Sequence, residues 1–372
     1  MFGRSVMIAA VLVYLGVMLG CVLYAPPERD IPAGYSHAER TVPLPMGGVA
    51  FQLHRMDWMD TQYHTYIDKI RDVGANTVLF VVKAYQSNGR SNEIYLDLRW
   101  APDDASLGRL IDYAHSKGLH VMLMPIVLLQ HPRGDEWRGK IEPDSWDAWW
   151  DSYASMIWHF ATLSESHKVD VLVVGSELVS TEGQTDRWID LIKRIRGWYK
   201  GMLTYSANWD HYDDKYIKFW DHLDLIGINS YWTLGNDSNV SVDEIVANWR
   251  KIQDRLMAFR EKVGRPVVMI EVGWCPIANA AKDPWDYTPP ESEVPTDLDL
   301  QRKLYEGFFR AWYGVKGFGG FMIWEWGSDS NGRGYSPEGK PAERVLREWL
   351  RKPWPRTNGT TINHTAPSTS EN

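Results

Sequence analysis

Two glutamates each end a run of apolar residues that has the composition of a buried strand. Glu177 follows the run 171–176, and Glu271 follows the run 267–270. A carboxylate is costly to bury unless it has a partner or a chemical task. Taken singly, Glu177 could instead cap a helix, and Glu271 could be half of a structural ion pair. Together they are what glycoside hydrolysis needs, because one carboxyl group must protonate the leaving oxygen while an ionised one attacks the anomeric carbon.

These glutamates require a fold that brings the ends of distant strands together. Continuously apolar interiors such as 171–174 are typical of parallel strands buried on both faces. Eight such strands alternating with helices predict an α/β fold, a single (β/α)8 TIM barrel with its chemistry at the carboxyl ends of the strands. Glu177 and Glu271 then end strands four and seven and can approach within several ångströms across the mouth. The expected strands are 48–54, 77–85, 120–128, 169–178, 202–209, 223–232, 266–274 and 319–326, with helical patterns at 61–73, 105–117, 145–163, 186–199, 242–263 and 298–313.

Aromatic residues with a polar edge are unusually frequent. The chain has 20 Trp and 18 Tyr against 10 Phe, and flat rings with a polar edge suit sugar faces. Several of them end predicted strands, where they could form platforms around a cleft or simply pack. Tyr231 is placed to donate a hydrogen bond to a neighbouring carboxylate and favour its ionised state. The strand-end aromatic residues are Trp209, Tyr231, Trp232, Trp274, Trp324 and Trp326.

Polar residues at strand ends and two loops complete the predicted cleft. Gln52, His54, Lys83 and Asn208 end strands and are candidate binders of sugar hydroxyls. Loop 131–140 carries charges and a tryptophan, and loop 276–296, with Trp285 and Tyr287, could wall the cleft. His64 and Gln301 have no such position and are expected at the surface. We therefore predict a substrate-binding set of Lys83, Trp137, Arg138, Asn208, Trp209, Tyr231, Trp274 and Trp324.

Other chemistries find little support in the sequence. The net charge of −8 without basic runs argues against a nucleic-acid partner. Cys21 and Cys275 are too few for a disulfide framework or a Cys-rich zinc site, and Cys275 is expected to be a buried apolar residue. Phosphate-loop and His-Glu-x-x-His motifs do not occur, and 328–332 resembles a calcium loop without its closing glutamate. We expect neither a cofactor nor a metal, and a monomer.

The two ends of the chain differ from the predicted barrel at 46–353. Residues 6–25 are uncharged and almost wholly apolar, long enough to span a bilayer, so 1–25 is expected to be a membrane anchor, a lipoprotein signal ending near Cys21 or a cleaved signal. Each alternative places the barrel outside the cytoplasm. Residues 26–45 are expected to be a linker, and 354–372 a disordered tail. Asn236, Asn239, Asn358 and Asn363 begin sequons.

Short motifs in the expected order resemble glycoside hydrolase family 113, a member of the large clan of retaining (β/α)8 glycosidases. They cover roughly 46–350 and include Val174-Gly175-Ser176-Glu177-Leu178, Leu203-Thr204-Tyr205-Ser206-Ala207-Asn208-Trp209, Phe219-Trp220-Asp221, Ile270-Glu271-Val272-Gly273, Trp137-Arg138-Gly139 and Trp324-Glu325-Trp326. The resemblance implies retaining hydrolysis, with Glu177 as general acid/base and Glu271 as nucleophile. Characterised members act on 1,4-β-mannans.

Two departures from the family pattern leave the glycan open. Ser176-Glu177 stands where the wider clan has Asn-Glu, and Met124-Pro125-Ile126 stands where the family carries a Lys and a His. We therefore expect a retaining hydrolase that is similar to endo-1,4-β-mannanases. The alternatives are a hydrolase of another cell-wall or exopolysaccharide β-glycan, a non-catalytic glycan-binding barrel, and another barrel enzyme such as a deacetylase or lyase.

Overall fold

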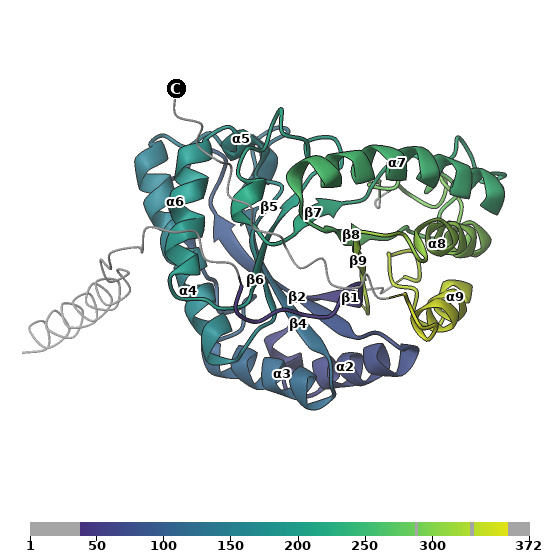
Figure 1. Cartoon of the computed structure of the whole chain (residues 1–372), viewed down its shortest axis with the longest axis horizontal. Helices are drawn as coiled ribbons and strands as arrows, with labels where there is room; N and C mark the ends of the chain where they lie inside the picture. Colours follow the sequence, from purple (N-terminus) through teal and green to yellow (C-terminus); the bar gives the residue numbers. More distant parts are fainter. Residues whose placement is uncertain (1–37, 287–288, 328–330, 356–372) are drawn as a thin grey trace, which may run out of the picture.

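The computed structural model describes residues 38–286, 289–327 and 331–355. Within these ranges, eight parallel strands form a closed barrel, because β1 pairs with both β2 and β9 (Figure 1). The predicted (β/α)8 TIM barrel is confirmed, with a short β3 (Ile94–Tyr95) added antiparallel to β2. The barrel strands are β1 (Met46–Leu53), β2 (Thr77–Gln86), β4 (His120–Leu129), β5 (Val171–Ser176), β6 (Met202–Ala207), β7 (Ile226–Asn229), β8 (Val267–Val272) and β9 (Phe318–Ile323).

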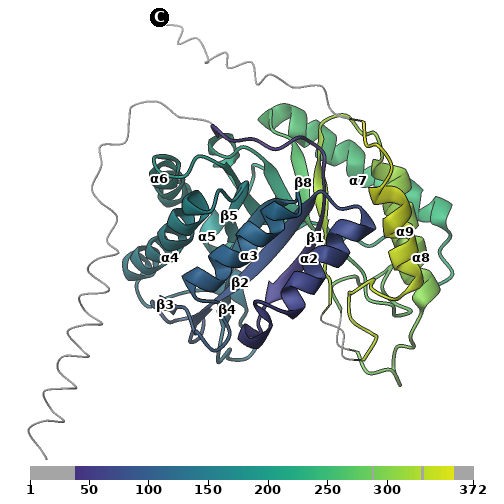
Figure 2. The ribbon, with the colours of Figure 1, turned by 90° about the horizontal axis from the view of Figure 1, so that it is seen from below.

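The helices surround the strands, and Figure 2 shows α2 and α3 outside the blue part of the sheet. Their ends follow the sequence, because Ser241 and Glu244 form a capping box at the start of α7 and Gly264 ends it in the left-handed conformation. The helices are α2 (Gln62–Val73), α3 (Asp104–Ser116), α4 (Trp146–Ser166), α5 (Val179–Glu182), α6 (Thr185–Arg196), α7 (Val242–Val263), α8 (Leu298–Trp312) and α9 (Pro341–Leu350), with short 3-10 turns η1 (Met56–Trp58), η2 (Arg138–Lys140) and η3 (Trp220–His222).

Alternating side chains divide the apolar core into two clusters. On β2, Leu79 and Val81 belong to a small cluster that fills the barrel. Val78 and Phe80 belong to the larger cluster between strands and helices. Lys83 continues the inward row of Leu79 and Val81, which places it at the carboxyl end of the barrel interior. We call this end, where the strands finish, the mouth, and the end where they begin the base.

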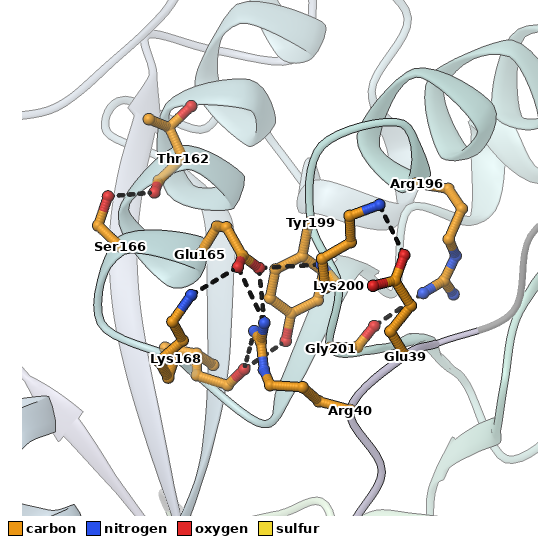
Figure 3. Close-up of polar contacts among 11 residues, drawn as sticks. Glu39, Arg40, Thr162, Glu165, Ser166, Lys168, Arg196, Tyr199, Lys200 and Gly201 are labelled. Atoms are coloured by element: carbon orange, nitrogen blue, oxygen red, sulfur yellow. Dashed lines mark hydrogen bonds and ion pairs between the residues drawn. The ribbon is translucent and has the colours of Figure 1, made fainter.

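The segment before β1 is fastened to the base. The amides of Glu39 and Arg40 both donate to the carbonyl oxygen of Lys200 at 2.9 Å. Arg40 also donates to both carboxylate oxygens of Glu165, at 2.8 and 2.9 Å, and Lys168 reaches the same carboxylate (Figure 3). These ion pairs tie residues before the first strand to α4 and to the start of β6, at the end of the barrel remote from both strand-end glutamates.

Several predictions fall on residues that the structure does not describe. The expected membrane anchor or signal at 1–25, most of the linker and nearly all of the tail lie outside the described residues, as do Tyr287 and the sequons at Asn358 and Asn363. In the part of the chain that is described, no helix combines the length and apolar character needed to cross a bilayer.

Candidate active site

A pocket of about 720 Å³ opens at the mouth and contains both strand-end glutamates. Side chains from several barrel strands and from the loops that follow them form its walls. Its lining residues are Gln52, Ile126, Leu128, Trp137, Arg138, Glu177, Asn208, Trp209, Tyr231, Glu271, Trp285, Trp324, Glu325 and Tyr335.

Glu177 is held in the pocket by two donors from separate segments. Arg138 of η2 donates to Oε2 at 2.5 Å, and Asn229 at the end of β7 donates to Oε1 at 2.7 Å. Both contacts stabilise the ionised carboxylate. The side chain is 11% exposed, so the ion pair with Arg138 is shielded from water.

The backbone that carries Glu177 is strained, and buried side chains support it. Glu177 has φ +54, a left-handed conformation that non-glycine residues seldom adopt. The next amide, that of Leu178, donates to the Tyr205 hydroxyl at 2.9 Å, and this hydroxyl donates to Glu182 at 2.9 Å. The amide of Glu177 donates to the carbonyl oxygen of Ser206. These contacts with β6 fix the turn, so Glu182 is a structural support for Glu177.

Glu271 reaches the pocket through a register shift in its strand. Ile228 pairs with Met269, whereas the next residue of β7, Asn229, pairs with Glu271. Ile270 is in the cluster inside the barrel, and Met269 is in the cluster outside it. Simple alternation from these two residues would place Glu271 outside. The extra residue breaks this alternation, as a bulge does, and directs Glu271 into the pocket.

Few partners stabilise a negative charge on Glu271. Tyr231 donates to Oε2 at 2.6 Å, which is the contact expected of Tyr231 from the sequence. Burial, followed by repulsion from Glu177, raises the pKa of Glu271 well above its ordinary value, against the hydrogen bond from Tyr231 and the charge of Arg138. In this arrangement Glu271 favours its protonated form.

A third carboxylate, that of Glu325, lines the same pocket. It follows β9, and its Oε1 accepts a hydrogen bond from Gln52 at 3.0 Å. Burial raises its pKa to about 7, although this hydrogen bond and the charge of Lys83 oppose the shift. Lys83 is half-buried, and burial lowers its pKa in spite of the nearby Glu325. Gln52 and Lys83 are predicted from the sequence to end strands, whereas Glu325 has no predicted role.

Aromatic and apolar side chains form the walls around the three carboxylates. Trp209 and Trp285 stack with ring centroids 5.9 Å apart and an interplanar angle of 13°, and Trp285 is 46% exposed. This places loop 276–296 at the cleft, as the sequence suggested. Ile126 and Leu128 of β4 give the pocket an apolar side. Flat rings beside polar groups suit a carbohydrate chain.

The structure brings most of the predicted set together, with clear exceptions. Trp274 is fully buried and packs on Trp249, Tyr305 and Phe308, so its prediction as a substrate-binding residue is wrong. Lys83 is not among the residues that line the pocket. Trp137, Arg138, Asn208, Trp209, Tyr231 and Trp324 do line it.

Other strand-end expectations also change. Trp232 and Trp326 are buried rather than exposed as platforms. Gln301, expected at the surface, is fully buried and donates to the carbonyl oxygen of Trp274 at 2.8 Å. His64 lies half-buried on α2, stacked on Tyr113. Cys275 is buried, as expected.

Sequence reasoning missed Asn229, Glu325 and Tyr335. Asn229 ends the sixth barrel strand, so the search for polar strand ends could have found it. Tyr335 lies in the loop after β9 and had no such signal. Among the described residues, no group of three or more His, Cys, Asp or Glu side chains is placed to hold a metal ion.

Comparisons with known proteins agree with this geometry. A sequence model of Glycoside Hydrolase Family 113 matches residues 49–338. The fold is similar to a GH113 β-1,4-mannanase solved as a complex, at 26% identity and TM-score 0.71 over 82% of this chain and 98% of that one. It is also similar to the GH113 β-mannanase AaManA from Alicyclobacillus acidocaldarius in complex with ManMIm, at 26% identity and TM-score 0.72 over 82% and 96%.

A more distant likeness, at 14% identity and TM-score 0.54, is to a GH5_18 protein from Streptomyces cattleya, with 84% of this chain and 83% of that one covered. It shows the fold alone. Comparison with curated proteins gives no match.

Proposed function

Because the chain belongs to glycoside hydrolase family 113, a retaining family of clan GH-A, we propose that it hydrolyses a β-linked glycan in the manner of an endo-1,4-β-mannanase. The observation that carries the proposal is the placement of Glu177 and Glu271 in one pocket, each at an irregular strand end. The mannanases at 26% identity support β-mannan as the glycan.

In the first step, a carboxylate oxygen of Glu271 attacks the anomeric carbon. The bond from that carbon to the glycosidic oxygen breaks, and this oxygen takes a proton from Glu177. In the second step, a water molecule gives a proton to Glu177 and attacks the same carbon. The ester bond to Glu271 breaks, and two inversions give net retention.

This cycle requires the proton of the pair to begin on Glu177. The contacts of Arg138 and Asn229 favour the opposite arrangement, with the charge on Glu177. Because the two carboxyl groups are coupled, a change of hydrogen bonds at either one redistributes the proton between them. We infer that substrate loosens the contact between Arg138 and Glu177 in the first step. The same contact then stabilises the ionised Glu177 that acts as base in the second step.

A different β-glycan is the second candidate. Ile126 and Leu128 make the β4 side of the pocket apolar, and Ile126 belongs to the segment that stands where the family carries a Lys and a His. A sugar unit that presents fewer hydroxyls to this side suits the wall better than one that needs two polar contacts. The two carboxylates favour a hydrolase over a non-catalytic glycan-binding barrel.

The test is a panel of soluble β-glycans, with product sizes measured over time and the first-formed anomer identified by proton NMR. We expect internal cleavage of β-mannan and a retained anomer. Glu306→Gln is a matched control, because Glu306 lies on the outer helix α8 and bonds Trp349. A panel with no β-glycan cleaved, or an inverted product, would contradict the proposal.

We also propose that the barrel works outside the cytoplasm, because 6–25 is an uncharged apolar stretch. Fractionation of the full chain beside a chain lacking 1–25 tests this. The proposal fails if both chains are recovered in the cytoplasm.

A further inference from the structure

One carboxylate oxygen in the pocket has no partner in the protein. Oε2 of Glu325 is buried, and the described residues offer it no hydrogen bond, whereas Oε1 is held by Gln52 at 3.0 Å. Glu325 is only 8% exposed and lines the pocket. An unsatisfied buried acceptor is destabilising, so its presence in a pocket calls for a ligand that supplies a donor.

The ammonium group of Lys83, which lies nearby, also lacks a hydrogen-bond partner in the described part of the chain. Lys83 continues the inward row of β2, and within the described ranges its ammonium group makes neither a hydrogen bond nor an ion pair. Gln52, which donates to Glu325, pairs with Val81 of β2, two residues before Lys83 on the same inward row. Lys83 and Glu325 accordingly influence each other's charge. An ammonium group has three donors, so both residues keep unused hydrogen-bonding capacity beside the same pocket.

The position of this pair indicates which sugar unit it serves. β9, which precedes Glu325, lies four strands from β5 in either direction around the barrel. Glu325 is therefore diametrically opposite Glu177, and it is one strand away from the β8 that carries Glu271. If Glu177 protonates the leaving oxygen, the leaving group lies toward β5. The sugar that becomes attached to Glu271 then extends toward β9, β1 and β2.

We propose that Glu325 and Lys83 bind two adjacent hydroxyls of the sugar unit that becomes attached to Glu271. Glu325 accepts a hydrogen bond from one hydroxyl, Lys83 donates to the oxygen of its neighbour, and Gln52 keeps the Glu325 carboxylate oriented. This inference rests on the proposed hydrolase function and adds a specificity to it.

The opposite charges of the pair define the class of sugar that fits. An amino group in place of the hydroxyl bound by Lys83 would bring a cation against a cation, and a carboxylate in place of the hydroxyl bound by Glu325 would bring an anion against an anion. An acyl group on either hydroxyl would remove the donor that Oε2 needs. The pair therefore selects a neutral, unsubstituted diol and rejects charged or acylated units at this position.

The experiment compares the wild-type enzyme with Glu325→Gln and Lys83→Met on aryl β-mannosides in which single hydroxyls of the glycone are replaced by hydrogen. An aryl leaving group confines the comparison to the glycone. For the wild type, removing the hydroxyl bound by Glu325 should lower kcat/KM roughly 10- to 100-fold, as for a hydrogen bond to a charged group. For Glu325→Gln the same deletion should cost less than about 3-fold, because most of the interaction is already lost.

Lys83→Met should show the same loss of discrimination at the adjacent hydroxyl, and Glu306→Gln should keep the wild-type profile. If Glu325→Gln does not fold, Lys83→Met provides the comparison alone. Unchanged discrimination in the variants would overturn the inference. Failure of the wild type to cleave β-mannan in the panel would instead contradict the proposed mannanase function, and the deletion series would then use the glycan identified by the panel.

Discussion

The base and the mouth of this barrel treat buried carboxylates in opposite ways. At the base, Asp170 would have its pKa raised by burial, but hydrogen bonds from His115, His120 and the Val121 amide lower the pKa well below its ordinary value. At the mouth, burial prevails and raises the pKa of Glu325 to about 7. The same desolvation thus has a different outcome because donors are abundant at one end and scarce at the other.

Side-chain partners account for this difference. Asp224 at the base pairs with Arg196 and accepts from the Leu203 amide at 2.8 Å, with both members of the ion pair only 4% exposed. At the mouth, Glu325 has one buried oxygen, Oε2, without a hydrogen-bond partner among the described residues. The contrast teaches that the partnered carboxylates at the base stabilise the fold, whereas the buried oxygen of Glu325 at the mouth is left without a partner, at a cost in stability.

The largest effect should follow removal of a carboxylate at the mouth. Glu177→Gln should lower activity on a natural glycan by about 10³- to 10⁴-fold, because the leaving oxygen loses its proton donor. An aryl glycoside with a good leaving group should lose far less and should show a burst, since hydrolysis of the glycosyl-enzyme loses its base. Steady-state and burst kinetics on both substrates measure this. Equal losses of activity on the two substrates would show that Glu177 is not the general acid and that its role is structural, at the start of the following helix.

The next largest effect should be a loss of stability when the buried ion pair between Asp224 and Arg196 at the base is broken. Asp224→Asn should lower the free energy of unfolding by roughly 3–5 kcal/mol, because it leaves Arg196 buried without its counter-charge. The kcat of the remaining folded enzyme should not change. Urea denaturation measures the loss, with Asp243→Asn as a control whose side chain is almost fully exposed. A midpoint equal to that of the control would show that the base ion pair does not stabilise the fold.

A smaller effect should appear in the pH dependence of stability. The folded-state pKa of Glu325, about 7, lies above its ordinary value of 4.5, so the folded protein holds this proton more tightly than the unfolded chain. The wild type should therefore lose about 1–3 kcal/mol of stability as the pH rises from 4.5 to 7, and Glu325→Gln should not show this part of the loss.

Asp170 should give a pH dependence of stability that is opposite to that of Glu325. Its pKa is lowered on folding, so it stabilises the protein above its unfolded pKa, and this stabilisation disappears as the pH falls. Asp170→Asn should therefore differ from the wild type most at neutral pH and least in acid. Unfolding curves for both variants across this range test the contrast. The contrast fails if Glu325→Gln and Asp170→Asn change the pH dependence of the free energy of unfolding in the same direction.

The strand order of the barrel could be read from the sequence because apolar runs and amphipathic helices alternate. The two strand-end glutamates were visible for the same reason. The orientation of side chains past a register shift was not visible. Glu271 turns into the pocket, whereas Trp274, three residues later, turns outward against α7 and α8. Both follow the same apolar run, so periodicity alone could not separate them.

The hydrogen-bond partners that other strands contribute could not be predicted from the sequence either. Asn229 binds Glu177 from β7, and Gln52 binds Glu325 from β1. Such pairs depend on the exact height at which each strand ends, which sequence patterns define only to within a few residues. Gln301 shows the same difficulty, because its side chain donates to the carbonyl oxygens of Trp274, just after β8, and of Tyr335, in the loop before α9.

The central claim is that Glu271, among three carboxylates in one pocket, forms the covalent bond to the sugar. An activated 2-fluoro glycoside slows hydrolysis of the glycosyl-enzyme more than its formation, so the adduct can be trapped, digested and located by mass spectrometry. We predict one adduct per chain, on the peptide that contains Glu271, and none with Glu271→Gln. An adduct on Glu177 or Glu325, or turnover without any adduct and with an inverted product, would contradict the account.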